Sequence, residues 1–95
     1  MVIKVIASGS DGNCYLINDG NTKILIECGI AFDDILRGAN YDISDIAACL
    51  ISHSHLDHGK SAHKLLEGGI DIMCHEETAS ELRLTGFGIR HIKEQ

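Results

Sequence analysis

Runs of apolar residues alternate with polar, turn-forming stretches along the first third of the chain. Three apolar runs predict strands over Val2–Ala7, Cys14–Asn18 and Thr22–Cys28. Residues 8–13 (Ser-Gly-Ser-Asp-Gly-Asn) are dense in turn formers, and residues 19–21 (Asp-Gly-Asn) carry a hairpin signal. The chain is therefore predicted to open as an antiparallel strand meander.

Further along the chain, the apolar pattern changes to alternating helical and strand-like segments. Apolar residues spaced three and four apart predict a helix over Ala31–Ala39. The other predicted elements are a buried strand over Ile46–Ser52, a helix over Lys60–Glu67, a strand over Ile70–Cys74, a helix from Glu76 to Gly86 and a last strand over Phe87–Lys93. Strands that alternate with helices in this way place the chain in the α/β class.

The size and composition of the chain indicate one small folded domain. Its 95 residues suffice for a single domain over residues 1–95. Hydrophobic residues make up 44% of the chain, with two Phe, two Tyr and no Trp, so the core must be aliphatic. Charged residues make up 23%, which is typical of a folded protein and not of a disordered one.

The charge balance limits the partners that this surface can hold by itself. The formal net charge is −6, and the basic residues do not cluster along the chain. Such a surface has no electrostatic footprint for binding a phosphate backbone. A bound metal ion would have to supply the local positive charge.

The cysteine pattern indicates free thiols. The four cysteines lie in or beside apolar runs: Cys14, Cys28, Cys49 and Cys74. None of them forms a C-x-x-C pair, and free cysteine behaves as a small core residue. With no signal peptide and no apolar run of membrane-spanning length, we expect a reducing, cytoplasmic setting. A structural Cys/His zinc site is a weaker alternative, because the spacings are wide.

Three histidines and one aspartate fall within the six residues 53–58 (His-Ser-His-Leu-Asp-His). This run follows a predicted strand, and open α/β sheets place ligands at that end of their strands. Residues two apart on an extended chain point the same way, so the first two histidines can reach one metal ion together. The aspartate and the last histidine come after the chain has begun to turn, so they can reach a second point nearby. Imidazole and carboxylate groups suit zinc and its transition-metal neighbours, and a solvated, His-rich loop is the alternative.

The run resembles the His-X-His-X-Asp-His signature of the metallo-β-lactamase fold hydrolases at His53, His55, Asp57 and His58. The resemblance implies that this chain is the N-terminal half of an α/β fold, the αββα sandwich of that family. It also implies a metal-dependent hydrolase in which His53 and His55 hold one metal ion. Asp57 and His58 would hold a second, and Asp57 would also accept a proton from the attacking water. The expected cofactor is Zn²⁺, as one or two ions, with Mn²⁺ or Fe²⁺ as alternatives.

The opening turn bears on the substrate. Residues 8–13 could instead cradle a phosphate, but they lack the G-x-x-x-x-G-K pattern and a strand follows them, so we interpret them as a turn. A Ser-Gly-Ser-x-Gly-Asn opening is similar to a compact bacterial and phage branch of the same fold with nuclease-like and phosphodiesterase-like members. The resemblance implies a phosphodiester or another ester as the bond cleaved, in nucleic acid or a small molecule. A β-lactam is a poor third choice.

Glu27, near the end of a predicted strand, is open to two interpretations. In the family, an acidic residue near this place, usually Asp, orients the histidines of the metal loop. A neutral histidine ligand generally donates its other N–H to such an acceptor. The side chain of Glu is one methylene longer than the Asp that is usual in the family. The alternative interpretation is therefore a surface glutamate without this role.

The resemblance covers essentially the whole chain but only the first half of the family's domain. The second half of that domain brings further histidine and aspartate ligands. Here only two side chains remain for each metal ion, whereas a catalytic zinc usually has three protein ligands. His75, which follows a predicted strand, is a candidate for a further ligand. His63 and His91 are expected to be structural or exposed.

A half-domain also has consequences for assembly. One sheet alone leaves an apolar face and an open strand edge uncovered, and such surfaces invite pairing with another chain. We expect a homodimer, an exchange of elements between copies, or a separate C-terminal half, and no membrane partner. Two functions therefore stay open at this point. The chain is either a metal-dependent hydrolase or a truncated metal-binding half-domain that is inactive alone.

Overall fold

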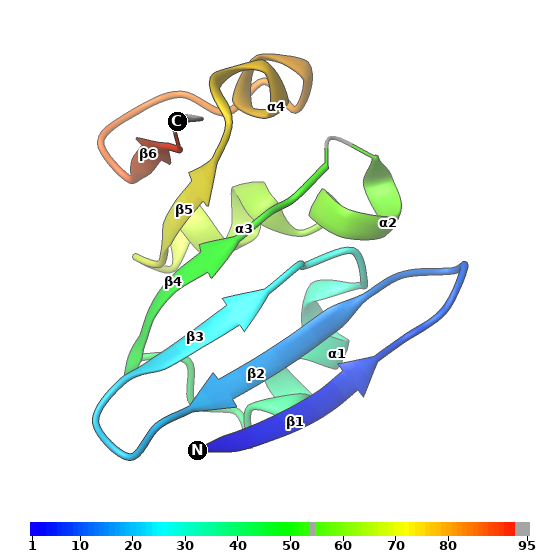
Figure 1. The fold of residues 1–95 in the computed structure, drawn as a ribbon, viewed down its shortest axis with the longest axis vertical. Helices are drawn as coiled ribbons and strands as arrows, with labels where there is room; N and C mark the ends of the chain where they lie inside the picture. Colours follow the sequence, from blue (N-terminus) through cyan, green and yellow to red (C-terminus); the bar gives the residue numbers. More distant parts are fainter. Residues whose placement is uncertain (54, 93–95) are drawn as a thin grey trace.

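A computed structural model describes residues 1–53 and 55–92 of the chain, apart from the side chains of Leu56 and Asp57. Six strands form one sheet in the order β1-β2-β3-β4-β5-β6 (Figure 1). The strands are β1 (Val2–Ala7), β2 (Cys14–Asn18), β3 (Lys23–Ile26), β4 (Ile46–Leu50), β5 (Asp71–Cys74) and β6 (Ile89–His91). The helices are α1 (Phe32–Gly38), α2 (Leu56–Gly59), α3 (Ala62–Glu67) and α4 (Glu76–Glu81).

The directions of the strands follow from the lengths of their connections. The strands β1, β2 and β3 are antiparallel neighbours joined by short turns, whereas β3, β4, β5 and β6 are parallel neighbours. Each parallel connection passes through at least one helix, because a parallel pair needs a long crossover. The predicted α/β class, a strand meander followed by alternating strands and helices, is confirmed. No helix in the described part of the chain has both the length and the apolar character to cross a membrane.

One face of the sheet packs against helices and forms the core. A row of apolar residues runs across the sheet in register on this face: Leu16, Leu25, Cys49, Ile72 and Ile89. The helices add Ile35 from α1 and Leu65 from α3, both fully buried. Figure 1 shows α1 and α3 behind the sheet in this view. Burial of each such side chain contributes about 1.5–3 kcal/mol, so this face holds the fold together.

The opposite face of the sheet is also apolar but is exposed in part. Neighbouring residues along a strand point to opposite faces. The residues next to the core row therefore form a second row in register, which we call the open row: Val5, Tyr15, Ile26, Leu50 and Met73. Val5 is 59% exposed and Met73 is 36% exposed, and Ile3 on the same face of β1 is 60% exposed. This face therefore offers an apolar surface on the side away from α1 and α3.

Two strands end earlier than the sequence predicts, and both ends lie at the candidate site. The strand β3 ends at Ile26 instead of Cys28, because Glu27 adopts a left-handed backbone conformation with φ of 66°. The strand β4 ends at Leu50 instead of Ser52, so His53 does not lie on an extended strand. The short helix α2 was not predicted. The prediction that strand alternation aims His53 and His55 at one point stays untested, because residue 54 between them lies outside the described residues.

All four cysteines are free and fully buried, which confirms the prediction of core-packed thiols. Burial, with a smaller contribution from the nearby Cys28, raises the pKa of Cys14 to about 12. A hydrogen bond with the Cys28 thiol and then burial raise the pKa of Cys49 well above its ordinary value. Burial likewise raises the pKa of Cys74. The thiols of Cys14, Cys49 and Cys74 are therefore held in their neutral form in the folded protein.

The raised thiol pKa values predict that the folded state loses stability in alkaline solution. Below about pH 9, the Cys14 thiol is neutral in both the folded and the unfolded state. Between about pH 9 and 12, it ionises only in the unfolded chain, so the folded state binds more protons and the free energy of unfolding falls as the pH rises. Urea unfolding followed by circular dichroism from pH 8 to pH 10.5 would measure this fall.

The Cys14→Ala variant separates this effect from other groups that titrate in the same range. It removes one thiol that resists ionisation, so its free energy of unfolding should fall less steeply with pH than that of the wild type. Equal slopes for the two proteins would contradict the assignment.

Candidate metal centre

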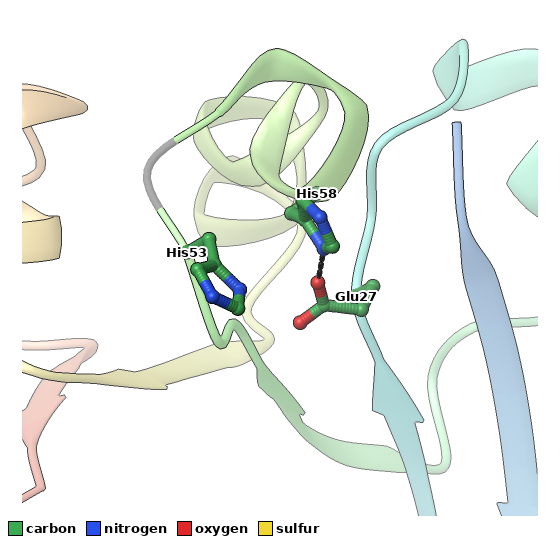
Figure 2. Close-up of side chains that lie close together, drawn as sticks. All are labelled: Glu27, His53 and His58. Atoms are coloured by element: carbon green, nitrogen blue, oxygen red, sulfur yellow. Dashed lines mark hydrogen bonds and ion pairs between the residues drawn. The ribbon is translucent and has the colours of Figure 1, made fainter. Parts of the chain in front are cut away.

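Residues from three segments come together at the carboxyl end of two parallel strands. Glu27 follows β3, and His53 follows β4 by three residues. Because β3 and β4 are parallel neighbours, these two residues lie at the same edge of the sheet. His58 belongs to α2, which brings it back over that edge. Figure 2 shows the imidazole rings of His53 and His58 near the Glu27 carboxylate, with a hydrogen bond between that carboxylate and His58.

The distances in this cluster suit one small ion. One potential ligand atom from each of Glu27, His53 and His58 lies within 4.8 Å of the other two. The ring centroids of His53 and His58 are 5.0 Å apart. The ring of His55 lies farther away, at 6.2 Å from His53 and 6.4 Å from His58, and outside that group of three. Among the described residues, the structure therefore pairs His53 with His58 more closely than with His55.

Glu27 is buried, so its interpretation as a surface residue is wrong. It is only 4% exposed, and its backbone N–H donates to the Leu50 carbonyl at 2.8 Å. Its carboxylate accepts the Ser52 backbone N–H at 2.6 Å on Oε1. On Oε2 it accepts the Ser52 hydroxyl at 3.0 Å and is hydrogen-bonded to Nδ1 of His58. Both oxygens therefore hold donors, which fits the role of an acceptor that orients the imidazoles better than the role of a metal ligand.

Backbone hydrogen bonds fasten the histidine loop to the segment that follows β3. The Cys28 N–H donates to the His58 carbonyl at 2.6 Å, and the Ser61 N–H donates to the Cys28 carbonyl at 2.9 Å. The Ser61 hydroxyl also donates to the Ile30 carbonyl. The position of His58 is thus fixed by the main-chain contact of His58 itself and by the contacts of Ser61 just after α2, as well as by Glu27.

The opening turn packs against the same segment. The Gly29 N–H donates to the Asn13 carbonyl at 2.9 Å, and the Asn13 side chain accepts the Gly9 N–H at 3.2 Å. A Cβ atom added at Gly12 would lie 2.3 Å from the Gly29 carbonyl oxygen, so only glycine fits at that point. The glycine-rich turn therefore supports the floor of the site through backbone packing.

The remaining predicted site residues are placed as follows. The side chain of Asp57 lies outside the described part of the chain, so the assignment of Asp57 and His58 to a second metal ion stays a prediction. The assignment of His53 and His55 to the first metal ion also stays a prediction. His63 contacts the Leu82 carbonyl at 2.9 Å, which is a structural contact between α3 and the end of α4. His75 precedes α4 and His91 is exposed at the end of β6, and neither belongs to the described cluster.

Ser52 is the residue of the site that sequence reasoning did not single out. Its Oγ lies 2.8 Å from Nδ1 of His53 and 3.0 Å from Oε2 of Glu27. The signal that could have found it is a hydroxyl-bearing residue directly before the first histidine of the run. The donor set of this cluster, two imidazoles with an acidic acceptor behind them, is suited to a divalent metal ion.

Comparison with known proteins establishes the family. The chain is an α/β protein in which imidazole groups gather at the carboxyl ends of the strands and form a candidate metal centre. A model of the metallo-beta-lactamase superfamily matches residues 7–90. The chain therefore belongs to the metallo-beta-lactamase superfamily, and its sheet is a partial form of that fold.

Similar curated proteins and solved structures agree with this assignment. The exodeoxyribonuclease WalJ of Streptococcus pneumoniae is 32% identical over 81 residues, which are 78% of this chain and 29% of WalJ. The exodeoxyribonuclease YycJ of Bacillus anthracis is 34% identical over 59 residues, which are 59% of this chain and 22% of YycJ. The metallo-beta-lactamase fold protein YhfI of Bacillus subtilis superposes with a TM-score of 0.72 at 20% identity, covering 98% of this chain and 45% of YhfI. The chain spans less than a third of the length of the two curated relatives.

The cluster predicts which histidines a metal ion needs. The variants His53→Ala and His58→Ala should each weaken Zn²⁺ binding by 10-fold or more, because each removes one of the two imidazoles beside Glu27. His91→Ala is the matched control, since His91 is an exposed histidine outside the cluster and its loss should leave the affinity unchanged. Isothermal titration calorimetry with Zn²⁺ would give both affinity and stoichiometry. Equal affinity in all three variants would show that the metal binds elsewhere.

Proposed function

We propose that this chain provides the N-terminal half of the active site of a metal-dependent hydrolase that cleaves phosphodiester bonds in nucleic acid. The observation that carries the proposal is the convergence of His53 and His58 on a buried Glu27 at the carboxyl edge of the sheet. Membership of the metallo-beta-lactamase superfamily and similarity to two exodeoxyribonucleases support the reaction and the substrate.

The proposed ligands follow the signature of the family. His53 and His55 hold one ion, and Asp57 and His58 hold the second, with Zn²⁺ as the proposed metal and Mn²⁺ or Fe²⁺ as alternatives. Such ions would supply a water of lowered pKa and positive charge beside the reacting phosphate. Asp57 would accept a proton from the water that attacks the phosphodiester. Glu27 keeps the imidazoles oriented while the reaction proceeds.

Bound metal ions would also offset the repulsion between this acidic chain and a phosphate substrate. With a net charge of −6, the surface repels a polyphosphate substrate at a distance. The proposed ions put positive charge only at the carboxyl edge of the sheet, where the scissile phosphate must sit. The buried free thiols fit the proposed cytoplasmic location, where a reducing environment keeps cysteines unpaired.

Hydrolysis of a simple phosphodiester tests the proposal. The purified chain, supplied with Zn²⁺ or Mn²⁺, should release nitrophenol from bis(p-nitrophenyl) phosphate. Asp57→Asn should lower the rate by about 10²–10⁴-fold, the usual contribution of a positioned general base. His91→Ala should keep the wild-type rate. Metal binding without any hydrolysis would favour the second function considered next.

The alternative function is a metal-binding half-domain that is inactive until a second polypeptide segment covers it. The observation that favours it is the open row, in which apolar residues such as Val5 and Met73 are exposed on one face of the sheet. Exposed apolar patches of this kind mark surfaces that another chain covers. In this reading, the segment that covers the face also brings the ligands that each metal ion lacks. A second copy of the chain would cover the same face where no such segment is present.

Self-association should therefore depend on the open row. Light scattering should give the wild-type chain a molar mass above the 10.3 kDa of one copy at high concentration. Val5→Lys puts a charge into the open row and should return the protein to a monomer. Ser80→Lys adds the same charge at an exposed position on α4 and should leave the association intact. A monodisperse wild-type monomer would rule out the association.

A further inference from the structure

The hydroxyl group of Ser52 lies between His53 and Glu27 in the candidate metal centre. The Ser52 Oγ is 2.8 Å from Nδ1 of His53 and 3.0 Å from Oε2 of Glu27. The same Oε2 is hydrogen-bonded to Nδ1 of His58. Four groups therefore form one continuous chain of hydrogen bonds from His53 to His58.

The direction of the hydrogen bonds in this chain follows from what each group can donate. An ionised carboxylate only accepts, so the Ser52 hydroxyl donates its one proton to Glu27. If that proton pointed at His53 instead, the serine oxygen and the carboxylate oxygen would face each other at 3.0 Å with no hydrogen between them. The serine oxygen is then an acceptor toward His53, and Nδ1 of His53 must carry a proton to donate to it.

His58 is fixed in the same way but directly. Its Nδ1 faces Oε2 of Glu27, an acceptor, so this nitrogen also carries a proton. In a neutral imidazole with a proton on Nδ1, the lone pair is on Nε2. The two histidines reach this state by different routes, one through a serine and one through the carboxylate itself.

We propose that Ser52 is a positioning residue that, through Glu27, fixes His53 in the tautomer with its proton on Nδ1, so that His53 presents Nε2 to its metal ion. The tautomers are a property of the metal-free chain, and their use for metal binding rests on the function proposed above. Without the serine hydroxyl, His53 loses its acceptor, whereas His58 keeps Glu27. The effect of removing the hydroxyl is therefore confined to one of the two histidines.

The local structure makes this residue a clean target for mutation. The side chain of Ser52 is exposed, so its truncation leaves no cavity in the core. Its backbone N–H donates to Oε1 of Glu27 at 2.6 Å, and this contact survives in Ser52→Ala. The substitution therefore removes only the hydroxyl group and keeps the carboxylate in place. Ser52→Thr restores a hydroxyl on the same carbon.

The experiment reads the tautomers directly in the metal-free protein. Long-range ¹H–¹⁵N NMR spectra of ¹⁵N-histidine-labelled chain, stripped of metal with chelator, would be recorded near pH 8.5, about two units above the ordinary imidazole pKa. In the wild type, both His53 and His58 should show the pattern of a proton on Nδ1. In Ser52→Ala, His53 should lose that pattern while His58 keeps it. Ser52→Thr should restore it, and Ser80→Ala, an exposed serine on α4, should change neither histidine.

Zinc affinity supplies the second readout. Loss of a group that orients a metal ligand typically costs 10–100-fold in affinity, so Ser52→Ala should bind Zn²⁺ about 10–100-fold more weakly, and Ser52→Thr should recover most of this loss. An unchanged His53 tautomer in Ser52→Ala, or a proton on Nε2 of His53 in the wild type, would overturn the positioning role. Wild-type tautomers as stated together with no Zn²⁺ binding would uphold the positioning role and overturn the proposed function instead.

Discussion

The buried carboxylate of Glu27 is the group on which the arrangement of the site depends. A carboxylate that is only 4% exposed is costly unless hydrogen bonds replace the water it has lost. Here the replacements come from Ser52 and His58, which are 25 and 31 residues farther along the chain. Because a buried charge left without donors costs several kcal/mol, the histidine loop is held where it can supply those donors. Burial of Glu27 therefore ties the position of the histidine loop to the end of β3.

The backbone conformation of Glu27 marks the point where β3 ends and the candidate site begins. With φ of 66°, this residue leaves the strand conformation, which is uncommon for a side chain of this size. The carboxylate accepts the backbone N–H of Ser52, two residues after β4. The next residue, Cys28, bonds through its main chain to His58 and Ser61. The strained conformation is held by contacts on both sides of it. Strain of this kind at a residue that touches the candidate ligands is typical of functional sites.

The sequence predicted the structure correctly where neighbouring residues decide it. It predicted the structure incorrectly where contacts between distant residues decide it. The six strands and three of the four helices could be predicted, because apolar spacing and turn residues report on nearby structure. The ends of β3 and β4 could not, since Glu27 and Ser52 leave their strands to make hydrogen bonds with partners far along the chain. The run of histidines was visible as a pattern. The closer pairing of His53 with His58 was not, because it depends on the short helix α2.

The exposed open row and the position of the histidine cluster at a sheet edge have one physical cause. A single sheet with helices against one face can bury only that face, and the open row is what remains on the other. The histidine cluster likewise takes its described ligand candidates from this one sheet edge and from α2. The same segment that covers the apolar face would approach the edge where His53 and His58 stand, since β3 and β4 contribute to both. If the proposed second segment covers the open row, burial of this apolar face and completion of the metal centre would be coupled.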